Sequence, residues 1–196
     1  MRIALLDYGA GNLHSLTKAL TPFASAVRCE PDPRRCLDAD LLVLPGVGSF
    51  PAAASHIAAA RLELGTAILA GFPVIGVCLG MQLLFDDSDE GPGAGLGVIA
   101  GRVTRLRAPR VPQMGWNSID DATDPSIAGL DIAYYANSFA CRPLDNATVG
   151  AWSTHGDDRF PALVRSRRAI GVQFHPEKSS AAGLRFLGAI IEECRA

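Results

Sequence analysis

Short apolar runs alternate with stretches of helical spacing through the first 85 residues. Helical spacing is expected over 13–20 and along the alanine-rich 52–70, and the apolar runs have the composition of buried strands. Strands that alternate with helices in this way predict an α/β fold with a doubly wound, mainly parallel sheet. The predicted strands of this part cover residues 2–7, 26–29, 40–44 and 72–77.

The alanine-rich helix has clear end signals. Ser49 is expected to cap its start, and Pro51 falls in its first turn, where the missing N–H costs nothing. Gly71 is expected to end it, as glycine often does at a helix C-terminus.

The pattern changes after Phe85. Residues 86–95 are acidic and rich in glycine, so we expect a solvated surface loop there. From residue 96 to about 170 short strands alternate with turns, which predicts an antiparallel elaboration on the parallel sheet. A buried strand at 169–174 and a last helix at 180–193 complete the chain.

Composition excludes several classes of protein. At 196 residues, 48% of them hydrophobic, the chain has ample core material for one domain over 1–196. The net charge of −2, with interspersed signs, argues against nucleic acid or an anionic membrane as a main partner. No apolar run approaches the roughly 18 residues of a membrane span. The N-terminal MRIALLDYG is typical of a first strand and not of a signal peptide.

The five cysteines are odd in number and irregularly spaced, and none forms a C-x-x-C pair. This usage fits a reducing cytoplasm, and it favours neither a disulfide framework nor a zinc site. We therefore expect a cytoplasmic protein with no metal and no cofactor. The cysteines stand at positions 29, 36, 78, 141 and 194.

Cys78 lies between a predicted strand and the helix-forming run 81–85, with Gly76 before it and Gly80 after it. Small residues on both sides of a nucleophile are typical of a nucleophile elbow, a turn too tight for larger side chains. The N-terminus of the following helix would favour the thiolate. The alternative is a buried, inert cysteine, a common state of free thiols.

A cysteine nucleophile needs a base and an orienting group. His175 directly follows the predicted strand 169–174, at the sheet edge where ligands and catalytic groups collect. Glu177 comes two residues later, and an extended H-P-E segment would place both side chains on one side. The alternative is a solvated Glu177 beside a structural His175. The other histidines (14, 56 and 155) are expected to have local structural roles.

Donors for an oxyanion are also available. The PGVG turn at 45–48 follows a predicted strand, and its glycines allow backbone amides to face a ligand. The amide of Leu79, directly after the nucleophile, is the natural second donor.

These residues resemble class I glutamine amidotransferase domains, whose flavodoxin-like fold agrees with the predicted sheet. Within that family, the chain is similar to the glutaminase subunits of imidazole glycerol phosphate synthase, in histidine biosynthesis. The motifs are spread over essentially the whole chain. They are DYGAGN at 7–12, LPGVGSF at 44–50, GVCLGMQ at 76–82, VPQMGWN at 111–117 and GVQFHPEKS at 171–179.

The resemblance implies hydrolysis of glutamine to glutamate and ammonia through a cysteine thioester. Cys78 matches the nucleophile, His175 the general acid and base, and Glu177 its orienting partner. The positions that match the oxyanion hole are Val47, Gly48 and Leu79. Those that match glutamine contacts are Gly46, Gln82, Ser138 and Phe139.

The resemblance also implies a partner, a (β/α)₈-barrel cyclase subunit that receives the ammonia. Together the two subunits would form a heterodimer that makes imidazole glycerol phosphate and AICAR. The residues that match the docking side are Asn12, Met114, Trp116, Asn117 and Lys178.

The chain departs from the family at three positions. The family usually has His where Gln113 stands, and His-Ser-Tyr or similar where Asn137, Ser138 and Phe139 stand. Residue 139 falls where the resemblance implies glutamine binding, and residues 113 and 137 fall where it implies interface signalling, so the resemblance carries over less directly there. The Cys-His-Glu set is intact.

Three other functions are also compatible with the sequence. One is a glutaminase subunit of another synthase, such as the anthranilate or pyridoxal phosphate systems; the pyridoxal type carries P-G-G-E-S at the corresponding turn. A second is a stand-alone cysteine hydrolase. The third is a regulatory subunit with a vestigial site.

Overall fold

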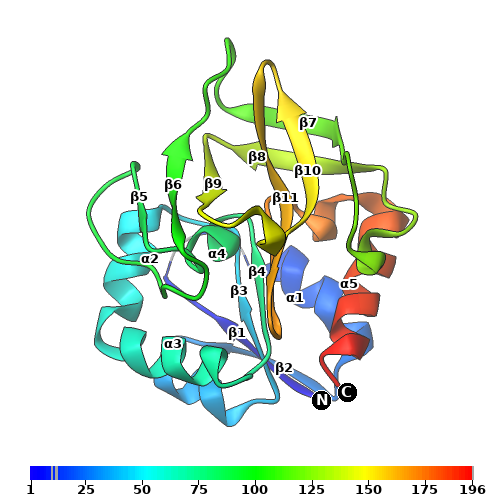
Figure 1. Cartoon of the computed structure of the whole chain (residues 1–196). Helices are drawn as coiled ribbons and strands as arrows, with labels where there is room; N and C mark the ends of the chain where they lie inside the picture. The colour runs from blue at the N-terminus through cyan, green and yellow to red at the C-terminus, as the bar shows by residue number, and fades with distance from the viewer. Residues whose placement is uncertain (10, 12, 196) are drawn as a thin grey trace.

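The computed structural model describes residues 1–9, 11 and 13–195. Within this part of the chain, the main sheet has seven strands in the order β10-β11-β12-β4-β3-β1-β2 (Figure 1). Neighbouring strands from β2 to β12 run parallel, and β11 and β10 continue the sheet antiparallel. The parallel strands are β1 (Arg2–Leu6), β2 (Ala26–Glu30), β3 (Leu41–Leu44), β4 (Val74–Val77) and β12 (Ala169–Val172). The antiparallel strands are β10 (Val149–His155) and β11 (Asp158–Ser166).

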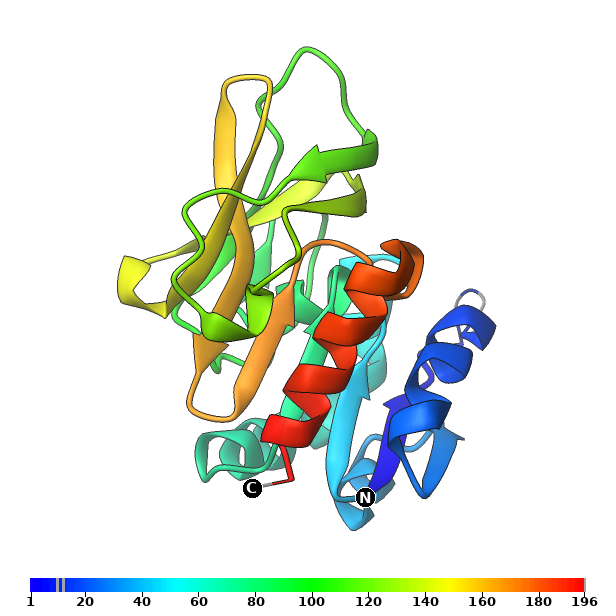
Figure 2. The same cartoon turned by 90° about the vertical axis from the view of Figure 1, so that its right-hand side faces the viewer.

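Helices cover both faces of this sheet, which confirms the predicted doubly wound arrangement. Helices α1 (His14–Leu20) and α5 (Ser180–Glu193) lie on the near side in Figure 2. Helices α2 (Phe50–Ile57), α3 (Arg61–Leu69) and α4 (Leu79–Gln82) cover the other face. Among the described residues, no helix combines the length and apolarity needed to cross a membrane.

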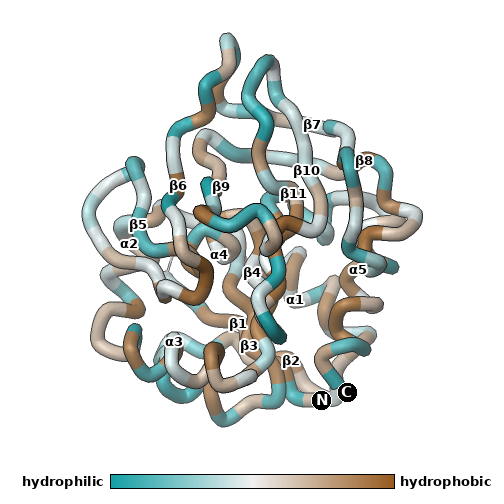
Figure 3. The backbone as a smooth tube through the Cα atoms, viewed as in Figure 1, coloured by the Kyte–Doolittle hydropathy of each residue, from teal (hydrophilic) through white to brown (hydrophobic). Residues whose placement is uncertain are grey.

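Alternating side chains of each strand supply two separate cores. Ile3 and Leu5 of β1 pack with α1 and α5, whereas Ala4 and Leu6 pack with α2 and α3. Because the central strands are buried on both faces, they are hydrophobic throughout (Figure 3).

The middle of the chain forms a second, antiparallel layer above the carboxyl ends of the parallel strands (Figure 1). There β5 (Asp87–Ser88) pairs with β6 (Gly101–Arg105), and β6 pairs with β9 (Phe139–Pro143). A separate pair joins β7 (Gln113–Ser118) to β8 (Ile132–Asn137). The predicted antiparallel elaboration is therefore confirmed, apart from the parallel β5–β6 contact. Short 3₁₀ helices lie at Thr21–Phe23, Arg34–Asp38, Ala58–Ala60, Pro125–Ile127, Asn146–Thr148 and Pro176–Lys178.

The prediction of one helix over 52–70 is wrong, because a 3₁₀ turn at Ala58–Ala60 separates α2 from α3. The Arg34 guanidinium donates to the Ala59 carbonyl, which a continuous α-helix would use internally. Ser49 occupies the N-cap position of α2, but its side chain makes no capping bond. Instead, the Glu90 carboxylate accepts the Phe50 N–H at 2.8 Å.

The predicted helical run 81–85 is also wrong beyond residue 82, because α4 is a single turn. The carbonyls of residues 83–85 accept hydrogen bonds from the backbone of 96–99 and do not continue a helix. Residues 86–95 are mostly exposed, as expected, but they are not merely a solvated loop. They include β5, the buried Ser88 and the contact of Glu90 with α2.

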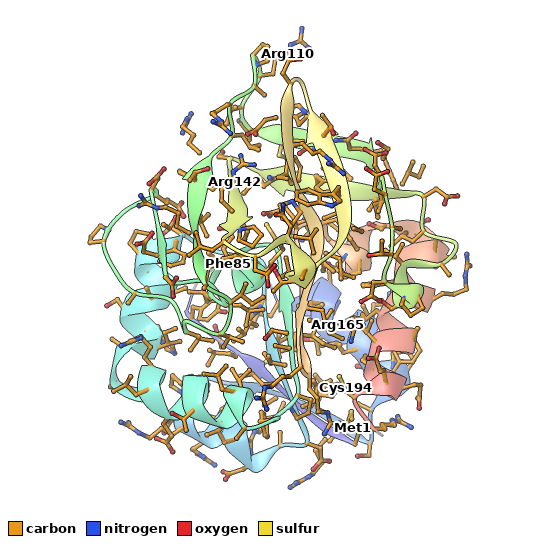
Figure 4. All side chains as sticks on the ribbon, in the orientation of Figure 1. Met1, Phe85, Arg110, Arg142, Arg165 and Cys194 are labelled. Carbon is orange, nitrogen blue, oxygen red and sulfur yellow. The ribbon has the colours of Figure 1, made fainter. Side chains whose placement is uncertain are left out.

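Arg165 of β11 ties the antiparallel layer to α5 (Figure 4). Its guanidinium contacts the Asp124 carboxylate at 2.6 Å and the Glu193 carboxylate of α5 at 2.6 Å. Burial raises the pKa of Asp124, but hydrogen bonds from Arg165 and Ser126 outweigh it and leave the pKa lowered. The ionised Asp124 therefore holds the loop before Pro125–Ile127 against β11.

The turn after β4 is the tightest backbone contact near the sheet edge. A Cβ added to Gly80 would lie 2.0 Å from the Leu44 carbonyl oxygen of β3. One added to Gly76 would lie 2.5 Å from the Gly80 carbonyl oxygen. Both obstacles are backbone atoms, so only glycine lets α4 start this close to β3.

We expect Gly80→Ala to lower the free energy of unfolding by about 3 kcal/mol, because overpacking against backbone cannot be relieved by a rotamer change. Gly129→Ala is the control, since its Cβ would meet nothing within 4 Å at a φ of +78°. Gly129→Ala should lower the free energy of unfolding by only about 1–2 kcal/mol, because alanine disfavours the left-handed backbone conformation. Urea unfolding measures both, and equal losses would contradict the steric explanation.

Candidate active site

The carboxyl ends of three neighbouring strands converge at one point of the sheet edge. β4 lies between β3 and β12, with Leu44 opposite Gly76 and Val77 opposite Val172. The Cys78 N–H donates to the Val172 carbonyl at 2.6 Å, so the ends of β4 and β12 are joined directly. The segments that follow these strands therefore meet above the sheet, as the sequence predicts for parallel strands.

Cys78 has the backbone geometry of a nucleophile elbow. Its φ of 50° and ψ of −103° are unusual for a residue with a side chain, and its exposed fraction is 6%. Such strain persists only where the surroundings hold it, and here Gly76 and Gly80 hold it. Helix α4 is too short for the expected helix-dipole effect on the thiolate, because one turn aligns few peptide dipoles.

His175 and Glu177 contact each other as expected, but through a different backbone shape. The imidazole Nδ1 lies 2.8 Å from Glu177 Oε1, and both side chains are about 95% buried. The expected extended H-P-E segment is wrong, because Pro176–Lys178 is a 3₁₀ turn with His175 at its N-cap. Proline fits the first position of a helical turn, so Pro176 starts the turn that carries Glu177 back to the imidazole.

The electrostatics of His175 favour its protonated form. Burial lowers its pKa, but hydrogen bonds and charge interactions with Cys78 and Glu177 outweigh burial. Together they raise the pKa of His175 from 6.5 to about 10. The second carboxylate oxygen of Glu177 is buried without a hydrogen-bond partner among the described residues. The site therefore stabilises the imidazolium form of His175, which lies between the Cys78 sulfur and the Glu177 carboxyl group.

The other buried thiols lack such a partner. Burial raises the pKa of Cys36 to about 12 and that of Cys194 to about 11. Burial and the nearby Cys78 raise the pKa of Cys141 well above its ordinary value. These thiols stay protonated, and Cys29 is the exposed one. Among the described residues, no group of three or more His, Cys, Asp and Glu side chains could hold a metal ion.

A cavity of about 200 Å³ lies beside the Cys78 sulfur. The structure places most of the predicted oxyanion and glutamine residues on it. Cys78, Gly46, Gly48, Leu79, Gln82, Ser138 and Phe139 all line it. Val47 instead lines a neighbouring cavity of about 320 Å³ on the side of His175, Glu177 and Lys178.

Gly46 lines both cavities and lies close to the side chains of Cys78 and His175. A Cβ at this position would lie 2.9 Å from Cys78 Cβ and 2.9 Å from His175 Cε1. The turn then continues to Gly48, whose φ of +97° is a conformation that glycine adopts readily. Leu79 opens α4, so its N–H has no partner within the helix and is available to a ligand.

Three polar residues of the site were missed by sequence reasoning. Glu90 lines the smaller cavity. Gln173 donates from Nε2 to Cys78 Sγ at 3.4 Å. The buried Ser179 hydroxyl donates to the His175 carbonyl at 2.7 Å and accepts the Tyr134 N–H at 2.9 Å. Of these three residues, only Gln173 could have been found from the sequence pattern, because it is a polar residue at the end of an apolar run.

The residues predicted for docking divide between the two faces of the β7–β8 pair. Met114 and Trp116 are exposed on the outer face, at 64% and 53%, and Trp116 packs edge-on against Tyr134 of β8. Lys178 Nζ lies 5.9 Å from the same Tyr134 ring. Asn117 points to the other face, where its amide donates to the Thr154 carbonyl at 2.8 Å. Its side chain thus faces β10, and Asn12 lies outside the described residues.

Two of the three departures from the family pattern lie directly opposite each other. Gln113 of β7 pairs with Asn137 of β8, and both are 96% buried. The Asn137 amide donates to the Phe139 carbonyl at 3.0 Å. Each side chain has a carbonyl oxygen with no hydrogen-bond partner among the described residues. Asn137 also lines the cavity beside Cys78, so this departure affects the shape of the site directly.

Comparison with known proteins agrees with this geometry. The model of the family "Glutamine amidotransferase class-I" matches residues 4–187. Solved structures share the fold at low sequence identity. One glutamine amidotransferase is 19% identical with a TM-score of 0.77, and covers 99% of both chains. PurLQS from Thermotoga maritima is also 19% identical, with a TM-score of 0.76 over 98% of both chains.

Curated relatives are more similar and match almost the whole chain. The imidazole glycerol phosphate synthase subunit HisH of Microcystis aeruginosa is 41% identical over 97% of this chain and 95% of its own. The HisH subunit of Symbiobacterium thermophilum is 42% identical, over 95% and 91% respectively. The chain therefore belongs to the class I glutamine amidotransferase family and, within it, to the HisH subunits of imidazole glycerol phosphate synthase.

Proposed function

We propose that this chain hydrolyses glutamine at Cys78 and supplies the ammonia to a cyclase subunit in histidine biosynthesis. One observation carries the chemistry. Cys78, His175 and Glu177 meet at the ends of β4 and β12, beside a cavity of about 200 Å³. The HisH relatives support the biosynthetic context. The chain acts as one amidotransferase domain over residues 1–196.

In the first step, the Cys78 proton moves to His175 and the thiolate attacks the amide carbon of the glutamine side chain. The carbonyl π electrons move to oxygen and form a tetrahedral oxyanion. In this proposal, the backbone N–H groups of Leu79 and of the Val47–Gly48 turn stabilise it. Each aligned donor contributes about 3–4 kcal/mol of transition-state stabilisation in such sites.

In the second step, His175 returns its proton to the amide nitrogen, and the C–N bond breaks to release ammonia. A γ-glutamyl thioester on Cys78 remains. Water then attacks this thioester while His175 accepts a proton, and the thiolate leaves. Glutamate departs, and Glu177 holds the imidazole in one orientation throughout.

Substrate selection follows from the polar lining of the smaller cavity. Glu90 is the carboxylate among the lining residues, which suits the α-ammonium group of an amino acid. The segment Ser138–Phe139 also lines this cavity and supplies backbone groups to it. Glutamine is thus held at its amino-acid end while its amide reaches Cys78.

The ammonia leaves through the larger cavity on the far side of Gly46. His175 and Ala136 line that cavity, and Ala136 lies opposite the exposed Met114 in the β7–β8 pair. We assign the outer face of this pair, with Trp116 and Lys178, as the docking surface for a (β/α)₈-barrel cyclase in a heterodimer. A cytoplasmic location belongs to the same proposal, since free thiols persist in a reducing compartment.

The proposed reaction predicts that Cys78→Ala lowers glutamate release by about 10⁴-fold or more, because no other group replaces the nucleophile. Cys29→Ala is the matched control, since Cys29 is exposed and does not line the cavity. Glutamate release is measured with the cyclase and its ribonucleotide present. Unchanged turnover in Cys78→Ala would reject the assignment.

Glu177→Gln should lower kcat by about 10²-fold or more, because the imidazole loses its orienting carboxylate. It should also change the pH dependence of stability. The folded-state pKa of His175, about 10, lies above 6.5. Its stabilising contribution is therefore complete below pH 6.5 and is lost as the pH rises to 10.

In Glu177→Gln the pKa of His175 falls, so less stability is lost across this pH window. Urea unfolding of both proteins between pH 6 and pH 10 checks the difference. Parallel stability curves would show that Glu177 does not support the imidazolium.

Trp116→Ala should weaken cyclase binding by roughly 30-fold, as loss of a central aromatic anchor commonly does. The control is Leu62→Ala, which removes an exposed apolar side chain (72% exposed) from α3. Glutamate release is titrated with cyclase. If both variants reach half-maximal glutamate release at the same cyclase concentration as the wild type, Trp116 is not part of the docking surface. High activity of the chain alone, unmoved by cyclase, would retain the cysteine chemistry and reject the synthase role.

A further inference from the structure

Gln173 is a buried amide directed at the reacting sulfur. It follows β12, its exposed fraction is 0%, and its backbone N–H donates to the Ala162 carbonyl at 3.0 Å. Its side-chain Nε2 lies 3.4 Å from Cys78 Sγ. An apolar residue of the same length would fill this space without burying a polar group, so the amide requires an explanation.

The direction of the Gln173 amide follows from a backbone group. The Phe139 carbonyl is an acceptor that cannot be reversed, and it lies 3.2 Å from Gln82 Nε2. Gln82 Nε2 is therefore a donor, and its other contact is Gln173 Oε1 at 3.4 Å. This places the Gln173 oxygen away from the sulfur and its N–H groups toward it.

A donor and an acceptor next to a sulfur have opposite effects on its protonation. The Ala136 carbonyl, 3.9 Å from Cys78 Sγ, accepts a hydrogen bond from the neutral thiol, which favours the protonated form. The Gln173 N–H favours the thiolate, because hydrogen bonds to a charged acceptor are stronger than those to a neutral one. Since the surroundings are buried, an N–H without its sulfur acceptor would remain unsatisfied.

We propose that Gln173 is a catalytic residue whose side-chain N–H stabilises the Cys78 thiolate. This inference deepens the proposed function and rests on Cys78 being the nucleophile. When the sulfur ionises, its proton moves to His175, and the N–H of Gln173 stays covalently intact. The same hydrogen bond stabilises the thiolate again as the leaving group, when water breaks the thioester.

Other ionisable groups lie near the same sulfur and also influence its titration. His175 follows β12, Cys141 belongs to β9, and Glu90 lines the cavity from the loop after β5. None of these groups can supply the uncharged N–H donor that Gln173 provides to the sulfur, because His175 and Glu90 change charge when they titrate and Cys141 is itself a thiol. Removing the Gln173 donor should therefore shift the balance toward the neutral thiol.

The first test compares Gln173→Met with Gln113→Met by alkylation with iodoacetamide across pH, read by mass spectrometry at Cys78. Both changes replace a buried glutamine by an apolar side chain, and only Gln173 contacts the sulfur. We expect the acidic limb of the Gln173→Met profile to move upward by about one pH unit, a tenfold lower thiolate fraction. Gln113→Met should retain the wild-type profile.

A folded Gln173→Met protein with the wild-type profile would overturn the proposal. A shift of equal size in Gln113→Met would overturn it too, because the effect would then be structural. Alkylation needs no glutamine turnover, so the outcome is separate from the proposed activity. Absence of glutamate release would reject the function without changing this test.

A second measurement uses the unaltered chain and does not depend on a variant that folds. The sequence contains only three glutamines, at 82, 113 and 173. Selective ¹⁵N labelling of glutamine side chains therefore gives three NH₂ signal pairs in an NMR spectrum. We expect the pair of Gln173 to shift when Cys78 ionises, and that of Gln113 to stay in place. If none of the three NH₂ signal pairs shifts when Cys78 ionises, the proposed hydrogen bond is contradicted.

Discussion

The close contact of backbone with backbone at the end of β4 determines the rest of the site. Gly80 lies against the Leu44 carbonyl, Gly76 lies against Gly80, and Gly46 touches both Cys78 and His175. With no side chains between them, the ends of three strands approach within van der Waals distance. The strained backbone of Cys78 is a consequence of this packing, and so is the meeting of sulfur and imidazole.

Burial then gives these few groups their chemical character. The thiols of Cys36, Cys141 and Cys194 are also buried, and burial raises the pKa of each although an arginine lies near each of them. At His175 the low dielectric constant of the buried site also strengthens the interactions with Cys78 and Glu177, and these interactions raise the pKa of His175. Desolvation therefore outweighs the nearby arginines at these three thiols, whereas at His175 the interactions with Cys78 and Glu177 outweigh desolvation.

Strand β8 connects the proposed docking face with His175. The His175 N–H donates to the Tyr134 carbonyl at 2.8 Å, and the Tyr134 N–H donates to Ser179. The ring of Tyr134 packs against Trp116 on the outer face. A partner that contacts Trp116 thus lies one strand away from the imidazole, and a shift of β8 reaches both. This arrangement supplies a physical route for coupling ammonia production to the presence of an acceptor.

The sequence by itself determined the features that depend on local pattern. Apolar runs located the strands, glycines on both sides of Cys78 indicated the elbow, and parallel strand ends predicted that His175 would reach it. The tertiary structure alone decided the rest. Glu90 reaches α2 across 40 positions, and Gln173 reaches Cys78 across 95. The packing of the β7–β8 pair decided that Asn117 faces β10 and that Trp116 faces outward. Side-chain direction and long-range hydrogen bonds arise from how elements pack, and residues far apart in sequence carry no shared local signal of it.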